Sequence, residues 1–444
     1  MKYKRIFLFF LLLTAITSGQ WLETTIPLTD SAGGIRFPKA LAYDSENNQV
    51  YVCGDIGNQV VVIDGVTNQK IAAIPVPSGG SHVCYNPVNQ KLYHSNFYDG
   101  SVTIIDCTTN NVLATVQTGA APRSLCCNIV ENKVYCTCSG SGFVSVIDGD
   151  ADSVVATIEV GTMASALCYN SINNRIYCAN SFSYTVSVID CVTDSVIATI
   201  VVGECPIELC YNSSNNRIYC AYSDSIAVID GSTNLIEARV GVGRLPFALC
   251  HIPTENVIYT ANMSGSTVSV IDCASNTVVA TIGVGIGSSA LCYDPVHNKA
   301  YCGNYDDDNV SVIDCSNNCV ILTLPAGDAP GAFTFNPLQC RIYVANDRDS
   351  TVTVYRDTTM PGIEEDSRSR TNKHLLGATI VSDILYLPEV SVTKRHALSI
   401  LLDINGRKVI NLVQGANDIR HLAPGVYFVR QNDNNQTTKV VIQK

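Results

Sequence analysis

Cysteine is frequent in this chain, and its spacing raises the question of what the thiols do. The sequence has 20 cysteines, and four pairs of them are ten residues apart: Cys126/Cys136, Cys168/Cys178, Cys210/Cys220 and Cys292/Cys302. If two strands pair about a turn centred near residue 173, Cys168 lies opposite Cys178, and a cross-strand disulfide is geometrically possible. The alternative is that Cys fills a small apolar site, because Ala, Val, Thr and His occupy these positions elsewhere. Zinc-site spacing is missing.

Acidic and histidine side chains form no recognisable catalytic motif. The sequence contains no G-x-S-x-G, H-E-x-x-H or P-loop pattern, so it offers no nucleophile elbow, zinc-protease helix or phosphate loop. The run Asp306-Asp307-Asp308-Asn309 could hold Ca²⁺ through oxygen ligands, although a solvated turn is the simpler interpretation. We therefore predict no catalytic residue, no metal site and no cofactor.

Aromatic and basic residues gather instead in connecting segments that differ from one part of the chain to the next. Variable loops on a constant scaffold are typical of a recognition surface. Rings beside polar groups suit a sugar polymer or a peptide, because they present a large area at low entropic cost. The alternative is that these rings pack between neighbouring loops. The candidate ligand-binding residues are Phe97, Tyr98, Phe143, Phe182, Tyr184, Tyr222, Tyr305, Arg123, Arg244 and Phe247.

A repeat positions these residues. Within 166–202, four runs rich in Val, Ile, Tyr and Cys occupy 166–170, 175–180, 185–190 and 195–202, separated by polar turns. Such runs are typical of short buried strands. An Asp closes the third run, and its copies are 42 residues apart except for one interval of 40: Asp64, Asp106, Asp148, Asp190, Asp230, Asp272 and Asp314. We expect these carboxylates to accept hydrogen bonds from the backbone of the following turn.

Four strands repeated every 40 to 45 residues are typical of a β-propeller blade, whereas a β-solenoid would need shorter rungs. An eighth copy of the third run, 351–356, has Arg356 in place of the Asp. We therefore predict an all-β chain whose residues 20–356 form an eight-bladed propeller, with seven blades as the alternative. The segment 23–28 matches a lone fourth strand, while the last copy ends after its third. The N-terminal strand should thus complete the last blade.

The amino-acid sequence of the repeat resembles that of a known family. RIYCAN (175–180), TVSVID (185–190) and VIATIVVG (196–203) are similar to the YVTN-type β-propeller repeat, a WD40/YVTN repeat-like unit of bacterial and archaeal extracellular and surface-layer proteins. The resemblance spans about residues 21–356, and it implies a surface or interaction role. Family members often have seven blades, whereas eight copies are counted in this chain.

The segments outside the repeat indicate export. Residues 1–19 have three basic residues, an apolar run and small residues before Gln20, which predicts a secretory signal peptide; an N-terminal membrane anchor is the alternative. No other stretch is apolar enough to cross a membrane. Residues 357–372 are rich in Ser, Arg and acidic residues and predict a linker. Residues 373–444 contain further strand-like runs, enough for a small β-sandwich.

Three segments of this last region, 398–412, 419–431 and 438–444, resemble the C-terminal sorting domain of the type IX secretion system. The Asn-Pro-rich opening that is common in that family is missing around 373–387. The resemblance implies that residues 373–444 interact with the secretion machinery. The protein would pass through the periplasm and be secreted or attached to the cell surface.

We expect an exported, non-enzymatic propeller that binds an extracellular glycan, a peptide or a cell-envelope component. A net charge of −11 argues against nucleic acid as a partner. A propeller hydrolase of the lactonase type is one alternative, and it would need acidic or His residues converging on the central channel from unlike blades. A purely structural surface-layer component is another.

Overall fold

The computed structural model describes residues 20–30 and 33–357, together with short C-terminal segments: 379–381, 384–387, 399–402, 408–412, 415–418, 425–431 and 437–442. Every regular element in these ranges is a β-strand, as predicted. The chain divides into two compact units, Met1–Ile363 and Glu364–Lys444. The predicted signal peptide and all of the predicted linker except Asp357 lie outside the described residues. No helix in the described ranges could span a membrane.

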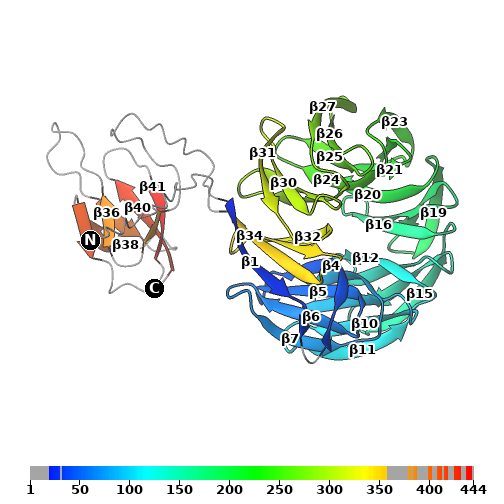
Figure 1. Cartoon of the computed structure of the whole chain (residues 1–444), viewed down its shortest axis with the longest axis horizontal. Helices are drawn as coiled ribbons and strands as arrows, with labels where there is room; N and C mark the ends of the chain where they lie inside the picture. The colour runs from blue at the N-terminus through cyan, green and yellow to red at the C-terminus, as the bar shows by residue number, and fades with distance from the viewer. Residues whose placement is uncertain are drawn as a thin grey trace, which may run out of the picture. The chain divides into compact units, whose positions relative to one another are not determined.

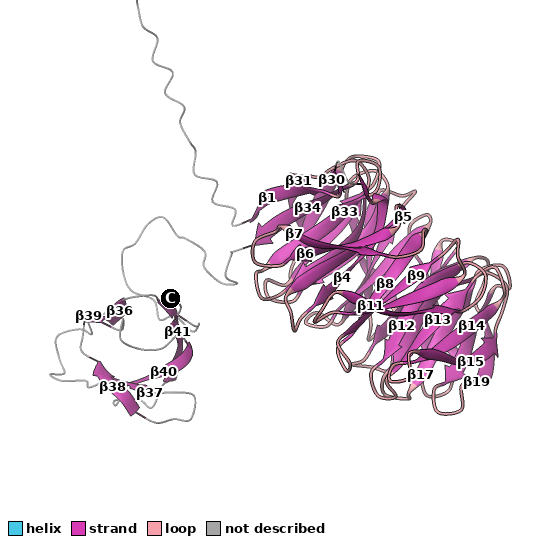
Figure 2. Cartoon of the chain, turned by 90° about the horizontal axis from the view of Figure 1, so that it is seen from below, coloured by secondary structure: helices cyan, strands magenta, loops and turns pink. Residues whose placement is uncertain are grey.

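The first unit is an eight-bladed β-propeller, which confirms eight blades over seven (Figure 1). Each blade is a four-stranded antiparallel sheet, and loops connect the strands at the two faces of the ring (Figure 2). The first four blades are β4 (Arg36–Asp44), β5 (Gln49–Ile56), β6 (Gln59–Asp64), β7 (Lys70–Pro75); β8 (Gly80–Asn86), β9 (Lys91–Asn96), β10 (Ser101–Asp106), β11 (Asn111–Gln117); β12 (Pro122–Asn128), β13 (Lys133–Cys138), β14 (Phe143–Asp148), β15 (Ser153–Glu159); and β16 (Ala164–Asn170), β17 (Arg175–Asn180), β18 (Thr185–Asp190), β19 (Ser195–Val201).

Blades 5 to 8 follow the same order, except that the last blade takes its fourth strand from the N-terminus. They are β20 (Pro206–Asn212), β21 (Arg217–Tyr222), β22 (Ser225–Asp230), β23 (Ile236–Gly241); β24 (Pro246–Ile252), β25 (Val257–Asn262), β26 (Thr267–Asp272), β27 (Thr277–Gly283); β28 (Ser288–Asp294), β29 (Lys299–Asn304), β30 (Asn309–Asp314), β31 (Cys319–Pro325); and β32 (Pro330–Asn336), β33 (Arg341–Asn346), β34 (Thr351–Asp357), β1 (Gln20–Pro27). A small hairpin, β2 (Thr29–Asp30) and β3 (Gly33–Gly34), precedes blade 1.

The strand register excludes the cross-strand cysteine pairing that the ten-residue spacing suggested. Cys168 lies opposite Tyr177, and Cys178 lies opposite Leu167. The same offset separates the other three pairs. The turn that joins β16 to β17 is centred half a residue earlier than expected, and a slip of one residue moves a side chain to the other face of a sheet. Many of the thiols instead pack between blades, as Cys168 and Cys178 do in two different core clusters.

Neighbouring blades are joined by a buried tyrosine. The second strand of every blade carries a Tyr with no exposed surface, and in several blades its hydroxyl donates to the turn between third and fourth strands of the next blade. Tyr177 donates to Asn234 Oδ1 at 2.7 Å, and Tyr259 donates to Asn318 Oδ1 at 2.6 Å. Each ring thus buries a large apolar area while its polar end remains satisfied.

The repeated Asp residues form the turn hydrogen bonds predicted for them. Asp190 Oδ1 accepts from the amides of Val192 and Thr193, at 3.1 and 2.9 Å. Asn170, which closes a first strand, accepts in the same way from Ile172 and Asn173. Because the Thr193 amide bonds to the ionised form, the pKa of Asp190 lies below its usual value. The repeated carboxylates that form such turns are therefore structural.

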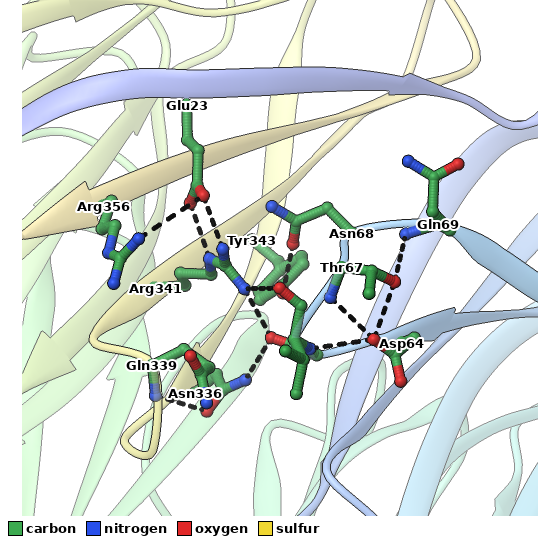
Figure 3. Close-up of polar contacts among 12 residues, drawn as sticks. Glu23, Asp64, Thr67, Asn68, Gln69, Asn336, Gln339, Arg341, Tyr343 and Arg356 are labelled. Carbon is green, nitrogen blue, oxygen red and sulfur yellow. Dashed lines mark hydrogen bonds and ion pairs between the residues drawn. The ribbon is translucent and has the colours of Figure 1, made fainter. Parts of the chain in front are cut away.

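The ring closes through β1, which pairs with β34 along its length, so the first and last parts of the propeller lie side by side (Figure 1). Figure 3 shows the polar contacts at this seam. Glu23 of β1 forms a bidentate ion pair with Arg341 of β33, with N···O distances of 2.5 and 2.6 Å. Arg341 also donates to the Gly65 and Val66 carbonyls of blade 1, at 2.6 and 2.8 Å. One guanidinium thus joins three segments that are distant in the chain.

A second network closes the other side of blade 8. Tyr301 of blade 7 has no third-to-fourth turn to meet, because the chain of blade 8 is interrupted there. Asp357 Oδ2 takes that place, accepting from Gln20 Nε2 at 2.6 Å and from Lys299 Nζ at 2.8 Å. Tyr301 lies 3.3 Å from the same oxygen. Residues at the two ends of the propeller segment thus provide the polar contact that the buried Tyr makes with a continuous turn in other blades.

The second unit is also built of strands where it is described. A five-stranded sheet has the order β35-β41-β40-β37-β38, and β36 pairs with β39 in a second sheet. Their bounds are β35 (Thr379–Val381), β36 (Ile384–Leu387), β37 (Ser399–Leu402), β38 (Lys408–Leu412), β39 (Gly415–Asp418), β40 (Gly425–Gln431) and β41 (Thr437–Ile442). Six of these strands overlap the strand-like runs of the sequence, which are 378–387, 396–404, 407–413, 425–430 and 438–444, whereas β39 lies in none of them.

Ring closure predicts a large effect from one carboxylate. Glu23→Gln should lower the melting temperature by several degrees, because it leaves the buried Arg341 guanidinium without its partner charge. Glu237→Gln is the matched control, since Glu237 pairs with Arg217 at 2.6 Å within blade 5 and joins no ends. Deletion of 20–29 should lower stability further. Equal melting temperatures for the two Gln variants would contradict a special role of the seam.

The turn carboxylates predict loss of stability in acid. Hydrogen bonds from the turn lower the pKa of Asp190, Asp230 and Asp272 in the folded protein. A depressed folded pKa stabilises the protein above the unfolded value of about 3.9, and this stabilisation is lost as the pH falls through the folded pKa. The free energy of unfolding in urea should therefore decrease between pH 5 and pH 3. The triple Asn variant should show a shallower decrease, and an unchanged slope would refute the assignment.

Candidate binding site at the centre of the ring

The first strands of neighbouring blades contact one another all the way round, from β4 through β32 and back to β4. Side chains at the beginnings of these strands, and in the loops that join second to third strands, surround two adjacent cavities. The large cavity has a volume of about 670 Å³ and is lined by residues of blades 1, 2, 3, 6, 7 and 8. The small cavity, of about 340 Å³, is lined mainly by blades 2 to 6. Ser81, Arg123 and Phe247 line both.

Half of the candidate binding residues lie on the large cavity. They are Phe97, Tyr98, Arg123, Phe247 and Tyr305. Phe97 and Tyr98 meet edge to face, with their ring centroids 5.4 Å apart, and the Tyr98 hydroxyl donates to Asp55 Oδ1 at 2.9 Å. These contacts fix the rings while leaving Tyr98 64% exposed.

Tyr305 is fixed on both sides. Its hydroxyl donates to Asp347 Oδ2 at 2.7 Å, and the guanidinium of Arg348 lies 4.8 Å from its ring centroid. Burial, together with the hydrogen bond to the Asp347 carboxylate, raises the pKa of Tyr305 to about 12. Tyr305 is therefore a neutral donor at any physiological pH.

The other five candidate binding residues do not line the large cavity, and their surroundings differ. Phe182 lines the small cavity and is 69% exposed. Phe143 and Tyr222 pack on inter-blade glycines, Gly119 and Gly203, where a side chain would collide with the rings. Arg239 adds a hydrogen bond to the Tyr222 hydroxyl at 3.0 Å. Tyr184 and Arg244 are exposed but do not line either cavity. The packing alternative thus describes Phe143 and Tyr222.

Two buried polar atoms on the large cavity have no partner within the described residues. Asp347 is 7% exposed; its Oδ2 accepts from Lys39 Nζ at 2.8 Å and from Tyr305, whereas Oδ1 accepts from nothing. The Ser289 hydroxyl is equally buried and also lacks a partner. The described part of the chain has twelve other unpaired buried polar atoms, but these two belong to residues that line the large cavity, so a ligand or water there is their natural partner. Sequence reasoning missed both residues.

The small cavity carries charge that sequence reasoning also missed. His82 of β8, Arg123 of β12 and Glu208 of β20 line it together. Burial lowers the pKa of His82 to about 4 and raises the pKa of Glu208 to about 7. At the equivalent position the other six blades have Ala or Ser. Aligning the first strands by their period would have shown both departures.

The acidic run of blade 7 has structural contacts. Asp307 Oδ2 accepts from the Ile286 amide at 2.7 Å, and Asp308 Oδ1 accepts from the Ala329 amide at 3.0 Å. Among the residues that the structure describes, one group has the donor set and spacing of a metal site: Asp294, His297 and Asp357. His297 Nδ1 lies 2.6 Å from Asp294 Oδ2. Because Lys299 and Gln20 already donate to Asp357 Oδ2, this group belongs to the closing network of the ring.

Comparison with known proteins supports the fold. No protein-family model matches this chain, and no curated protein matches it. The hydrazine synthase of Kuenenia stuttgartiensis has a similar solved structure, with a TM-score of 0.54 and 15% sequence identity over 73% of this chain and 97% of that chain. At this identity the similarity concerns the fold alone.

The two surroundings of the aromatic residues predict different responses to truncation. Tyr222→Ala should lower the melting temperature markedly, because the ring packs on Gly203 and holds Arg239. Phe182→Ala should leave it within about a degree, since that ring is largely exposed. Differential scanning calorimetry checks both variants. A large destabilisation by Phe182→Ala would make that ring a packing residue.

Proposed function

We propose that this chain is an exported propeller that binds an extracellular carbohydrate in the large cavity. A volume of about 670 Å³ is within the range of small-ligand sites. Four aromatic residues present ring faces or edges to it, and a ring face attracts the weakly positive C–H groups of a sugar. The polar atoms of the cavity narrow the choice among the ligand classes that the sequence suggests, which are a glycan, a peptide and a cell-envelope component.

The observation that carries the proposal is the pair of unpartnered polar atoms, Asp347 Oδ1 and Ser289 Oγ. A carboxylate oxygen needs a donor, and a hydroxyl can donate or accept. Sugar hydroxyl groups provide both functions at short spacing beside an apolar face. A peptide could also place donors there, but its side chains would have to match the polar atoms singly. Carbohydrate is thus the ligand class that the cavity fits best.

A binding experiment tests the proposal directly. The secreted full chain is screened on a glycan array, and hits are measured by isothermal titration calorimetry. Tyr305→Ala combined with Phe97→Ala should weaken binding at least tenfold, about 1.4 kcal/mol, because both rings line the cavity. Tyr184→Ala is the control, since it removes an exposed ring that lines neither cavity. Absence of any glycan hit, with binding of a peptide instead, would overturn the proposal.

Export is proposed from the sequence resemblance of residues 373–444 to the type IX sorting domain. The structure improves the design of its test, because Asp357 is buried and closes the ring. Truncation after Ile363 keeps this residue and removes the second unit. In a host with that secretion system, the truncated propeller should remain folded in the periplasm. Normal display at the cell surface would refute the role of the C-terminal unit.

A further inference from the structure

The symmetry of the ring reveals two residues that depart from their structural equivalents. Every blade has an equivalent of one position in its first strand. It is the second residue after the Pro, Gly, Ala or Ser near the beginning of that strand. These are Ala40, His82, Ser124, Ala166, Glu208, Ala248, Ala290 and Ala332. Six are small, so the scaffold itself requires neither charge nor length at this position. His82 and Glu208 are therefore additions to the scaffold.

His82 and Glu208 both line the small cavity, although they belong to blades 2 and 5. The backbone of His82 is held by Ser95, whose hydroxyl accepts from the His82 amide at 2.9 Å and donates to its carbonyl at 3.2 Å. The ring nitrogen Nδ1 is buried and has no partner in the described part of the chain. Since burial keeps the ring neutral, Nδ1 is an acceptor when Nε2 carries the proton.

Glu208 is the second acceptor. It forms no ion pair with any described residue, and the charged group nearest in effect is Arg123, which favours its ionised form. Glu208 is half-buried, and a carboxyl group in such surroundings either holds a proton or pairs with a cation. A neutral imidazole nitrogen and a carboxylate on one cavity therefore call for a group with several donors and a positive charge. A primary ammonium group, with three donors, has both properties.

We propose that the small cavity binds the ammonium group of an amino sugar, with Glu208 as its counter-ion and His82 Nδ1 as a second acceptor. This inference rests on the proposed function, because the rest of the oligosaccharide would occupy the large cavity. The two cavities share Ser81, Arg123 and Phe247, so one oligosaccharide can extend across both. The net charge of −11 favours the approach of a cationic glycan.

The pH dependence of binding follows from the groups that surround Glu208. Arg123 on β12 stays charged, and His82 across the cavity stays neutral above pH 5. Three thiols interact with the Glu208 carboxyl: Cys168 on β16, Cys210 on β20 and Cys220 on β21, and burial raises the pKa of each. Glu208 thus titrates alone among these groups near pH 7. Because only its ionised form attracts an ammonium group, the affinity for the protonated amine, corrected for the fraction of ligand amines that is protonated at each pH, should fall about 20-fold from pH 7.5 to pH 5.5.

Calorimetry with matched glycans tests the inference. The full chain is titrated with chitosan oligosaccharides, whose sugars carry free amines, and with their fully N-acetylated counterparts. The amine form should bind at least tenfold more tightly at pH 7.5 and lose this preference at pH 5.5. Glu208→Gln should abolish the preference and its pH dependence while the N-acetylated affinity stays unchanged. Glu237→Gln, which alters an outer-strand carboxylate, should change neither.

A second variant protects the test against misfolding. Glu208→Ala introduces the residue that five other blades carry at this position, so it should fold. His82→Ala should weaken binding of the amine form alone. The inference fails if the wild-type chain shows no preference for amines, or if Glu208→Gln and Glu208→Ala retain it. Binding of other glycans would then leave the proposed function intact, whereas failure of every carbohydrate would overturn both.

Discussion

The contact between the buried tyrosine of one blade and a turn of the next is the interaction on which the ring depends. It recurs with nearly the same geometry in unlike blades, as Tyr135 with Asp194 and Tyr343 with Asn68 show at 2.7 Å each. An apolar ring alone would allow the blades to slide, but a directed hydrogen bond at its tip fixes their angle. The turn is in turn held by its Asx hydrogen bonds, so local and inter-blade order support each other.

A closed ring must also join its ends. Toward blade 1 the repeating contact is kept, because Tyr343 donates to Asn68, and the Glu23–Arg341 ion pair adds to it. Burial disfavours ionisation of Glu23, yet the two bonds from Arg341 outweigh it and the pKa of Glu23 is lowered. Toward blade 7 the chain is interrupted, and the side chains of Asp357 and Gln20 replace the turn that a continuous chain provides in the other blades.

The sequence predicted those features of the fold that recur from blade to blade. Strand positions in blade 4 agree with the expected runs, apart from two residues added at the start of β16 and one fewer at the end of β19, because alternation and turn residues encode them locally. The half-residue shift of the β16–β17 turn was invisible to spacing alone, and it decided between the two interpretations of the cysteines. For the site, loop variation identified Phe97 and Tyr305, but not Asp347 or Ser289. Their role depends on the lack of a hydrogen-bond partner, which can be recognised only in the three-dimensional structure.

The symmetry of the scaffold explains how charge can be tolerated at its centre. Ala occupies the position of Glu208 in five blades, so the blade packs without a long side chain there. Burial raises the pKa of Glu208, so this carboxyl group lowers the stability of the protein as the pH rises from about 4.5 to about 7. The turn aspartates have the opposite sign and gain stability as the pH rises. A charged side chain that the fold does not require, at a position where Ala suffices, agrees with the proposal that Glu208 pairs with a ligand.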